Sequence, residues 1–309
     1  MKIRNPLILA IAGLASAVSA ATSFGPLVSP TQLSEQFKEF QPIVLDIRGD
    51  DYAKGHIPGA VSAPYGLFRG PKNNPGQVPA RAALEQAYEA LGLETGRSVV
   101  IVPEGENDSD FGAAARVYWT LKSSGFTNLS ILNGGVLAWQ KAGMPMNAEL
   151  VTPQPTELDI AFLDNWTANT EQVEAASRGE VDALLLDARP EDFYQGRKSH
   201  GAAARSGTVP GAANLEYTAF FDQGSPAMSQ STDSASLLQK LGVEEGAEIV
   251  SFCNTGHWAA TNWFALSEVA GLGNVKLYPG SMVEYSNTDY DMENTPGVFS
   301  NFLNKISGN

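Results

Sequence analysis

The chain has 309 residues, which exceeds one average domain and makes two domains the expectation. Hydrophobic residues make up 43% and charged residues 17% of the chain, a composition typical of folded globular proteins, which excludes a disordered chain. The net charge of −14 argues against nucleic acid and anionic membrane surfaces as partners, and an anionic substrate must therefore be attracted by a local positive site.

The N-terminal segment has the pattern of a secretory signal. Lys2 and Arg4 form a basic start, residues 7–14 form an apolar core, and Val18-Ser19-Ala20 fits a small-residue cleavage site. We expect residues 1–20 to be removed after Ala20 and the protein to be periplasmic or secreted; an uncleaved membrane anchor is the alternative. No later stretch is apolar enough to span a bilayer, so no stable membrane association is expected.

The first half alternates between strand and helix. Apolar runs predict strands at 42–48, 98–102 and 129–132. Helical spacing and capping residues predict helices at 32–40, 80–91, 111–124 and 134–139. Such alternation predicts a parallel sheet with helices on both faces.

The second half repeats this order. Residues 184–189 match 43–48, and residues 207–212 match 55–60. The repeat predicts two similar α/β domains at 25–146 and 164–295. A Pro- and Thr-rich linker at 147–163 joins them, and a tail at 296–309 follows.

The only cysteine, Cys253, stands between an apolar strand at 249–252 and a helix that starts at Ala259. A loop that closes into a helix N-terminus points backbone N–H groups at its centre, which favours a thiolate there. Gly256 lets this loop turn sharply. In an exported protein a single cysteine without a partner is better explained by chemistry than by structure, although a buried cysteine that acts as a small apolar residue is the alternative.

Two motifs occur in the same order in both halves: Leu-Asp-x-Arg, then Gly-x-(Ile/Val)-Pro-Gly-Ala. Only the second copy is followed by a cysteine loop; the first half has Pro103 at the matching place. This ordered set resembles the tandem-domain rhodaneses, the thiosulfate and mercaptopyruvate sulfurtransferases, over residues 27–290. The resemblance implies two rhodanese-like domains, the first inactive and the second catalytic. It also implies a Cys253 nucleophile that carries a sulfane sulfur as a persulfide to cyanide or a thiol.

The loop positions after Cys253 are expected to bind the sulfur donor; they are Asn254, Thr255, Gly256, His257, Trp258 and Ala259. Ala259 stands where the related Cys-loop phosphatases have an arginine, which argues against phosphate transfer. His257 is interpreted either as a cation or acid that acts on the sulfur donor, or as a solvent-facing side chain. Trp258 is interpreted either as a pocket wall or as packing between domains.

Three further residues enter through the resemblance. Arg189, at the C-terminal end of a strand, is implied to bind the anionic group of the sulfur donor, with an ion pair to a nearby carboxylate as the alternative. Arg197 is a weaker candidate for the same role. His56 matches a histidine that faces the cysteine across the domain interface in mercaptopyruvate enzymes; the alternative is a histidine that closes its own turn.

Thiosulfate is the expected sulfur donor, because export exposes the enzyme to inorganic sulfur anions. Mercaptopyruvate is the alternative, since Thr255-Gly256 fits half of the Cys-Gly-(Ser/Thr)-Gly pattern of enzymes that use it. A non-catalytic persulfide carrier that hands sulfur to a protein partner is a third hypothesis.

No cofactor is expected, and the scattered histidines and single cysteine do not make a zinc site. The carboxylates of the loop at 104–110 lack the glycine and terminal Glu of a known calcium loop, so a solvated acidic loop is the preferred interpretation.

Overall fold

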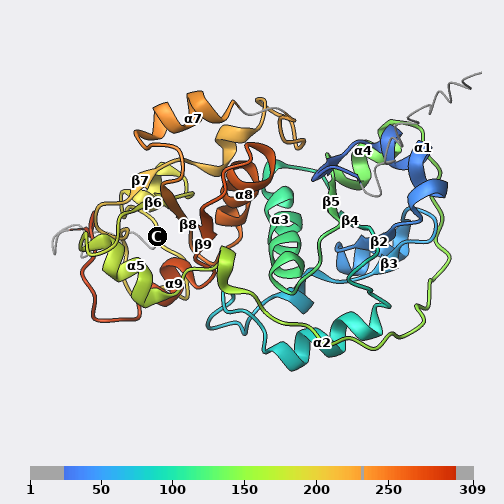
Figure 1. The fold of residues 1–309 in the computed structure, drawn as a ribbon, viewed down its shortest axis with the longest axis horizontal. Coiled ribbons are helices and arrows are strands. Elements are labelled where there is room, and N and C mark those ends of the chain that lie inside the picture. Colours follow the sequence, from blue (N-terminus) through green and yellow to red (C-terminus); the bar gives the residue numbers. More distant parts are fainter. Residues whose placement is uncertain (1–23, 231–232, 297–309) are drawn as a thin grey trace, which may run out of the picture.

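The computed structural model of the protein describes residues 24–230 and 233–296, which form two α/β domains (Figure 1). The predicted signal at 1–20 and nearly all of the predicted tail at 296–309 lie outside the described residues. Within the two described ranges, no helix is long and apolar enough to cross a membrane.

The first domain contains a five-stranded sheet in the order β1-β5-β4-β2-β3, and every neighbouring pair is parallel. Its central strands are apolar at almost every position because helices cover the sheet on both faces. The strands are β1 (Leu27–Val28), β2 (Ile43–Asp46), β3 (Val61–Ser62), β4 (Val99–Val102) and β5 (Leu129–Leu132).

Helices α1 (Pro30–Phe40) and α4 (Gly135–Lys141) cover one face of this sheet, and α2 (Arg81–Ala90) and α3 (Asp108–Ser123) cover the other. Helix α1 begins two residues earlier than predicted because the side chain of Ser29 accepts the N–H of Gln32, and the Gln32 side chain accepts the N–H of Ser29. Asn107 caps α3 in the same way and brings its start forward.

The second domain has a four-stranded parallel sheet in the order β7-β6-β8-β9. Its strands are β6 (Ala183–Asp187), β7 (Ala213–Asn214), β8 (Glu248–Phe252) and β9 (Val275–Leu277). Its helices are α5 (Thr170–Ser177), α6 (Glu191–Tyr194), α7 (Ser234–Leu241), α8 (Trp258–Phe264) and α9 (Ser281–Tyr285). The prediction of two parallel-sheet domains is therefore confirmed.

The two domains meet through α3 and α8, which lie side by side at the centre of the molecule, and one continuous hydrophobic core runs between the two sheets (Figure 1). The ring of Phe264 packs edge-on against Phe111 and Tyr118, with centroid distances of 5.4 and 5.0 Å. At the end of α3, Lys122 forms a 2.7 Å ion pair with Glu268. This interface presses the loop before α8 against the first domain.

The acidic loop at 104–110 directs its carboxylates to separate partners. Glu104 pairs with Arg48 at 3.1 Å, and Asp110 accepts the N–H of Glu106 at 2.8 Å. Asp108 accepts the hydroxyl of Tyr217 at 3.3 Å, which ties the loop to the second domain. Across residues 24–230 and 233–296, no group of three or more His, Cys, Asp or Glu side chains is placed to hold a metal ion.

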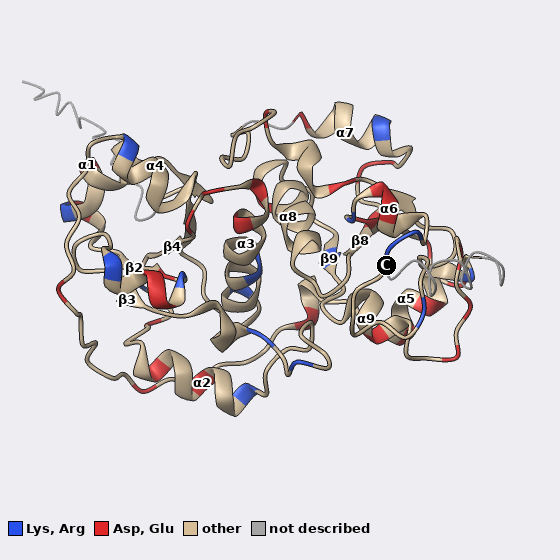
Figure 2. Ribbon diagram, turned by 180° about the vertical axis from the view of Figure 1, so that it is seen from behind, with Lys and Arg blue, Asp and Glu red and all other residues tan. Residues whose placement is uncertain are grey.

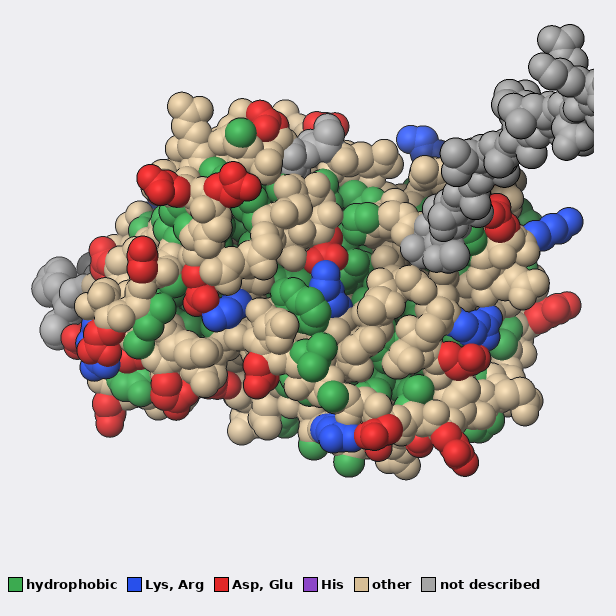
Figure 3. Space-filling model, viewed as in Figure 1, with side chains coloured by type: hydrophobic (Ala, Val, Ile, Leu, Met, Phe, Trp, Pro, Cys, Tyr) green, Lys and Arg blue, Asp and Glu red, His purple; other side chains and the backbone are tan. Residues whose placement is uncertain are grey.

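The charged side chains do not form a continuous basic surface on the face shown in Figure 3, where Lys and Arg lie singly among Asp and Glu. Viewed from behind, Figure 2 shows basic positions on α3 and on the loop that runs beneath it, close to the second domain. The local positive charge of the molecule is therefore found partly at the domain interface.

Candidate active site at the Cys253 loop

Cys253 follows β8, a central strand of the second sheet, and α8 begins five residues later at Trp258. The loop between them therefore leaves the sheet at its C-terminal edge, where parallel α/β sheets place their sites. Cys253 is only 1% exposed and belongs to the hydrophobic cluster that contains residues of both domains. The predicted strand, loop and helix around the cysteine are present.

Ser281, which the sequence did not single out, holds this loop in shape. Its hydroxyl oxygen accepts the N–H groups of Cys253 and Gly256 at 3.0 and 3.1 Å, and its O–H donates to the carbonyl of Tyr278 at 2.8 Å. Ser281 itself has a left-handed backbone with φ of 52°, a conformation that is unfavourable for serine. This backbone conformation places the Ser281 hydroxyl between the N–H groups of Cys253 and Gly256.

The loop carbonyls are bound as well, while several of its amides are free. The N–H groups of Met282 and Val283 donate to the carbonyls of Cys253 and Asn254, both at 3.0 Å. In the part of the chain that the structure describes, the N–H groups of Asn254, Thr255 and His257 have no hydrogen-bond partner. Free amides in a short loop are suited to stabilise an anionic sulfur.

Gly256 is required at its place for two reasons. Its φ of 66° lies in the left-handed region. A Cβ there would also approach the carbonyl oxygen of Pro279 to 2.6 Å and Nη1 of Arg116 to 2.4 Å. The loop is thus packed directly against an arginine of the first domain.

His257 and Trp258 both bind the first domain. Tyr65 donates its hydroxyl to Nδ1 of His257 at 2.9 Å, and the Nε2–H of His257 donates to the carbonyl of Ser109 at 2.9 Å. Trp258 donates its indole N–H to the hydroxyl of Ser109 at 2.9 Å, and its ring stacks on Tyr217 with centroids 5.1 Å apart. Of the two interpretations of Trp258, these contacts match packing between the domains.

The His257 imidazole is neutral. Burial, and then the charge of Arg69, lower the pKa of His257 to about 4. Its single N–H is already given to Ser109. The structure therefore corrects two expectations: His257 is not a cation that attracts the sulfur donor, and its proton is not directed at a leaving group.

The lowered pKa of His257 makes stability depend on pH. An unfolded histidine has a pKa of about 6.5. As pH falls, the unfolded chain therefore takes up this proton at a higher pH than the folded chain does. Stability from the neutral imidazole is therefore complete above about pH 6.5 and is lost as pH falls through the folded value of about 4. We compare the unfolding free energies of wild type and His257→Gln. The advantage of wild type over the variant is expected to be smaller at pH 4 than at pH 7, by up to about 3 kcal/mol. Urea unfolding at both pH values measures this, and an advantage that does not change with pH would contradict it.

Two first-domain arginines that were not predicted from the sequence lie close to the loop: Arg116 contacts it, and Arg69 contacts Tyr65, which binds it. Arg116 on α3 is 0% exposed; its Nη2 donates to the carbonyl of Gly76 at 2.8 Å, and its Nη1 lies 3.5 Å from the carbonyl of Gly256. Arg69 follows the 3₁₀ turn at Tyr65–Phe68, with its guanidinium 5.2 Å from the centre of the Tyr65 ring. The signal available for Arg116 was a charged residue inside an apolar helical stretch; nothing local marked Arg69.

Arg189 forms the ion pair that was the alternative to binding the sulfur donor. Its guanidinium binds Asp187 through Nε and through Nη2, the latter at 2.6 Å, and Nη2 also donates to the carbonyl of Gly207. Nη1 lies 3.5 Å from the side-chain oxygen of Asn254. Arg189 is thus buried in an ion pair with Asp187, and its remaining nitrogen lies beside Asn254 of the cysteine loop.

Arg197 and His56 are not brought to the loop either. Arg197 is 54% exposed and pairs with Asp192 at 2.9 Å. His56 is buried in the first domain, stacks on Tyr52, and has its ring nitrogens 2.9 and 3.0 Å from the carbonyls of Tyr52 and Glu149. His56 therefore closes its own turn, which is one of the two interpretations drawn from the sequence, and it does not face Cys253.

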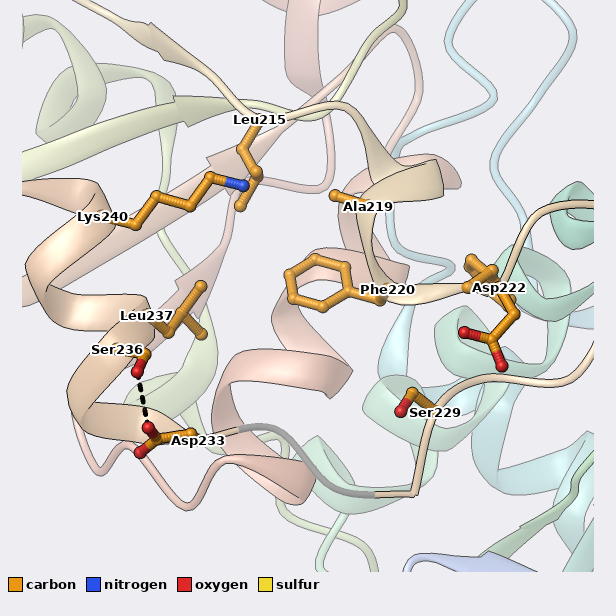
Figure 4. Close-up of a pocket in the computed structure, with 10 residues that line it drawn as sticks. Leu215, Ala219, Phe220, Asp222, Ser229, Asp233, Ser236, Leu237 and Lys240 are labelled. Carbon is orange, nitrogen blue, oxygen red and sulfur yellow. Dashed lines mark hydrogen bonds between the residues drawn. The ribbon is translucent and has the colours of Figure 1, made fainter.

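A separate hollow of about 360 Å³ lies in the second domain between α7 and the turn at Tyr217–Phe220 (Figure 4). Phe220 and Leu237 form its apolar wall, and Lys240, Asp222 and Asp233 lie at its edge. No residue of the cysteine loop lines this hollow, so it is not part of the Cys253 site.

Comparison with known proteins agrees with this architecture. The model of the rhodanese-like domain matches twice, at residues 29–142 and 169–288. The thiosulfate sulfurtransferase of Azotobacter vinelandii is 32% identical over 263 residues, which cover 84% of this chain and 94% of the relative. The 3-mercaptopyruvate sulfurtransferase of Escherichia coli is 28% identical over 237 residues, covering 76% of this chain and 82% of the relative.

Solved structures show the same fold. The crystal structure of the Escherichia coli 3-mercaptopyruvate sulfurtransferase superposes with a TM-score of 0.70 at 24% identity, covering 84% of this chain and 99% of that chain. The anaerobic ergothioneine biosynthesis enzyme of Chlorobium limicola gives a TM-score of 0.74 at 19% identity, covering 87% and 70%. Together with the paired domain matches and a cysteine loop only in the second domain, these likenesses show that the chain belongs to the tandem-domain rhodanese family and is a rhodanese-type sulfurtransferase.

Proposed function

We propose that the protein transfers the outer sulfur of thiosulfate to cyanide or a thiol through a persulfide on Cys253. The Cys253 thiolate attacks the outer sulfur, the S–S bond of thiosulfate breaks, and its electron pair leaves with sulfite. The acceptor then attacks the outer persulfide sulfur, and Cys253 departs as the thiolate. No external oxidant or reductant is consumed, and the remaining loop amides stabilise the anionic sulfur between the two steps.

Thiosulfate is favoured because neither of the two candidate proton donors, His56 and His257, has a proton directed at the cysteine loop. Transfer from mercaptopyruvate leaves an enolate, which benefits from protonation, whereas sulfite leaves readily and needs charge stabilisation instead. The ring nitrogens of His56 lie on the carbonyls of Tyr52 and of Glu149 in the linker, and the N–H of His257 is given to Ser109. Relatives named thiosulfate sulfurtransferase, at 32% and 31% identity, add support.

Two alternatives have their own support. The Escherichia coli relative named 3-mercaptopyruvate sulfurtransferase favours that donor, together with the Thr255-Gly256 pair. A relative from Thermus thermophilus named a sulfur carrier protein, 25% identical, favours a carrier that delivers persulfide sulfur to a protein.

Kinetics with both sulfur donors tests the proposal. We expect kcat/KM for thiosulfate, with cyanide as acceptor, to exceed that for mercaptopyruvate by at least about tenfold, a difference of about 1.4 kcal/mol in barrier. His56→Ala should leave both activities within about twofold, since the ring nitrogens bind carbonyls of Tyr52 and Glu149 and not the cysteine loop. A loss of about 10²-fold or more with mercaptopyruvate alone would instead identify His56 as a general acid and mercaptopyruvate as the sulfur donor.

Intact mass distinguishes enzyme from carrier. Wild-type protein incubated with thiosulfate is expected to gain one sulfur atom and to lose it to cyanide over many cycles. A protein that gains the sulfur once but gives it up only to another protein would be the carrier.

We also propose that the protein is exported, on the basis of the basic start, apolar core and Val18-Ser19-Ala20 site of its first 20 residues. N-terminal sequencing of the protein recovered from an expressing bacterium should begin at Ala21. An intact Met1 in the recovered protein would contradict cleavage.

A further inference from the structure

Two arginines beside the Cys253 loop have no carboxylate partner in the described part of the chain. Among residues 24–230 and 233–296, neither Arg69 nor Arg116 takes part in an ion pair, although Arg116 is fully buried. Arg48 and Arg189, by contrast, each bind a carboxylate of their own domain at 2.7 and 2.6 Å. A buried cation without a counter-ion is unfavourable, so the uncompensated pair is suited to receive an anion.

Both guanidinium groups also have N–H donors that are not used in hydrogen bonds to the described residues. Nε of Arg116 and Nη1 of Arg69 are buried and have no hydrogen-bond partner among the residues that the structure describes. One strong bond to Gly76 and one long contact to Gly256 leave most of the five N–H groups of Arg116 unused. Planar, forked donors of this kind match the oxygens of an oxyanion.

The pair lies beside the cysteine loop. A Cβ on Gly256 would come within 2.4 Å of Nη1 of Arg116, and Arg69 is linked to the loop through Tyr65, whose hydroxyl binds His257 at 2.9 Å. Burial, and then the charge of Arg69, lower the pKa of Arg116 to about 9, while a Cys253 thiolate raises it. Arg116 is therefore cationic at neutral pH, and its charge is felt at the sulfur.

We propose that Arg69 and Arg116 bind the oxyanion group of the sulfur donor, which in thiosulfate is the sulfonate group. This inference rests on the proposed function and adds to it the residues that hold the substrate. The first domain has no cysteine loop, yet it supplies the anion-binding half of the site. When the S–S bond of thiosulfate breaks, the electron pair and its charge stay on sulfite, where the two guanidinium groups stabilise them.

Binding to a protein that cannot react tests this directly. Calorimetry measures the affinity of thiosulfate for the full chain with Cys253→Ser, alone and combined with Arg69→Met or Arg116→Lys. We expect either second change to weaken binding about ten- to a hundredfold, the effect of losing a hydrogen bond to a charged group. Arg81→Met, which removes an arginine that is 55% exposed on α2, is the matched control and should leave affinity within about twofold.

Affinities that equal the Arg81→Met control would overturn the proposal, and so would the absence of thiosulfate binding to Cys253→Ser. If Arg116→Lys fails to fold, the half-buried Arg69→Met decides the question. This binding measurement needs no sulfur transfer, so its outcome is independent of the proposed function. If wild-type protein fails to turn over thiosulfate, the proposed function is wrong. Whether binding depends on Arg69 and Arg116 is then still decided by the calorimetry.

A kinetic comparison adds a second readout. With Cys253 intact, Arg69→Met should raise KM for thiosulfate, and should affect methanethiosulfonate less, because that sulfur donor carries one oxygen and one charge fewer. An equal loss with both sulfur donors would contradict recognition of the oxyanion group.

Discussion

Replacing Cys253 by serine is expected to abolish sulfur transfer from both thiosulfate and mercaptopyruvate. Cys253 is the only thiol of the chain, and a serine hydroxyl is neither ionised at neutral pH nor able to form a persulfide. The loss should exceed about 10³-fold, as expected when the nucleophile of a covalent mechanism is removed. Steady-state rates and intact mass after incubation with each sulfur donor measure it.

The fold should survive this change, because the loop is held by bonds of its backbone to Ser281, Met282 and Val283 and not by the thiol. Circular dichroism and urea unfolding check that point. Ser130→Ala, a buried change on β5 of the first domain, is the control and should keep turnover. Sulfur transfer by Cys253→Ser at rates near wild type would place the nucleophile elsewhere and remove the basis of the proposed mechanism.

Replacing Arg189 by alanine is expected to destabilise the protein more than it impairs recognition of the sulfur donor. The carboxylate of Asp187 is fully buried and would lose the guanidinium that neutralises it. Leaving such a charge unpaired costs about 3–5 kcal/mol of unfolding free energy. Urea unfolding measures the loss, and kcat/KM measured well below the new transition separates it from catalysis.

Arg197→Ala is the matched control for this experiment, since Arg197 is 54% exposed and pairs only at the surface. Its effect should stay below about 1 kcal/mol. Unchanged stability of Arg189→Ala together with a raised KM for thiosulfate would instead show that Arg189 binds the sulfur donor, as the resemblance implied.

The elements of the fold were predictable because their signals are local or repeated. The apolar runs at β2, β4, β5 and β8 are buried on both faces, so their hydrophobicity marks them directly. The start of α3 was missed by three residues because the cap depends on the side chain of Asn107.

The cysteine loop was also visible in the sequence, since strand, turn, glycine and helix follow one another around Cys253. Backbone order alone places the thiol at the C-terminal edge of a parallel sheet. The ion pair between Asp187 and Arg189 spans only two positions, and it was available as an alternative for the same reason. What such patterns leave open is which polar group an arginine or histidine finally meets.

Only the tertiary structure decided that question. Packing places the ring of His56 inside the first domain and leaves His257 neutral between Tyr65 and Ser109. It also brings Arg116 against Gly256 of the cysteine loop, and Arg69 against Tyr65, which binds that loop. Charge state and hydrogen-bond partners depend on which groups are buried together, and here that follows from the packing of α3 on α8. The sequence by itself determined the two domains and the position of the thiol; the charged surroundings of that thiol arise only when the domains meet, because burial and electrostatic contact act between residues that no local pattern connects.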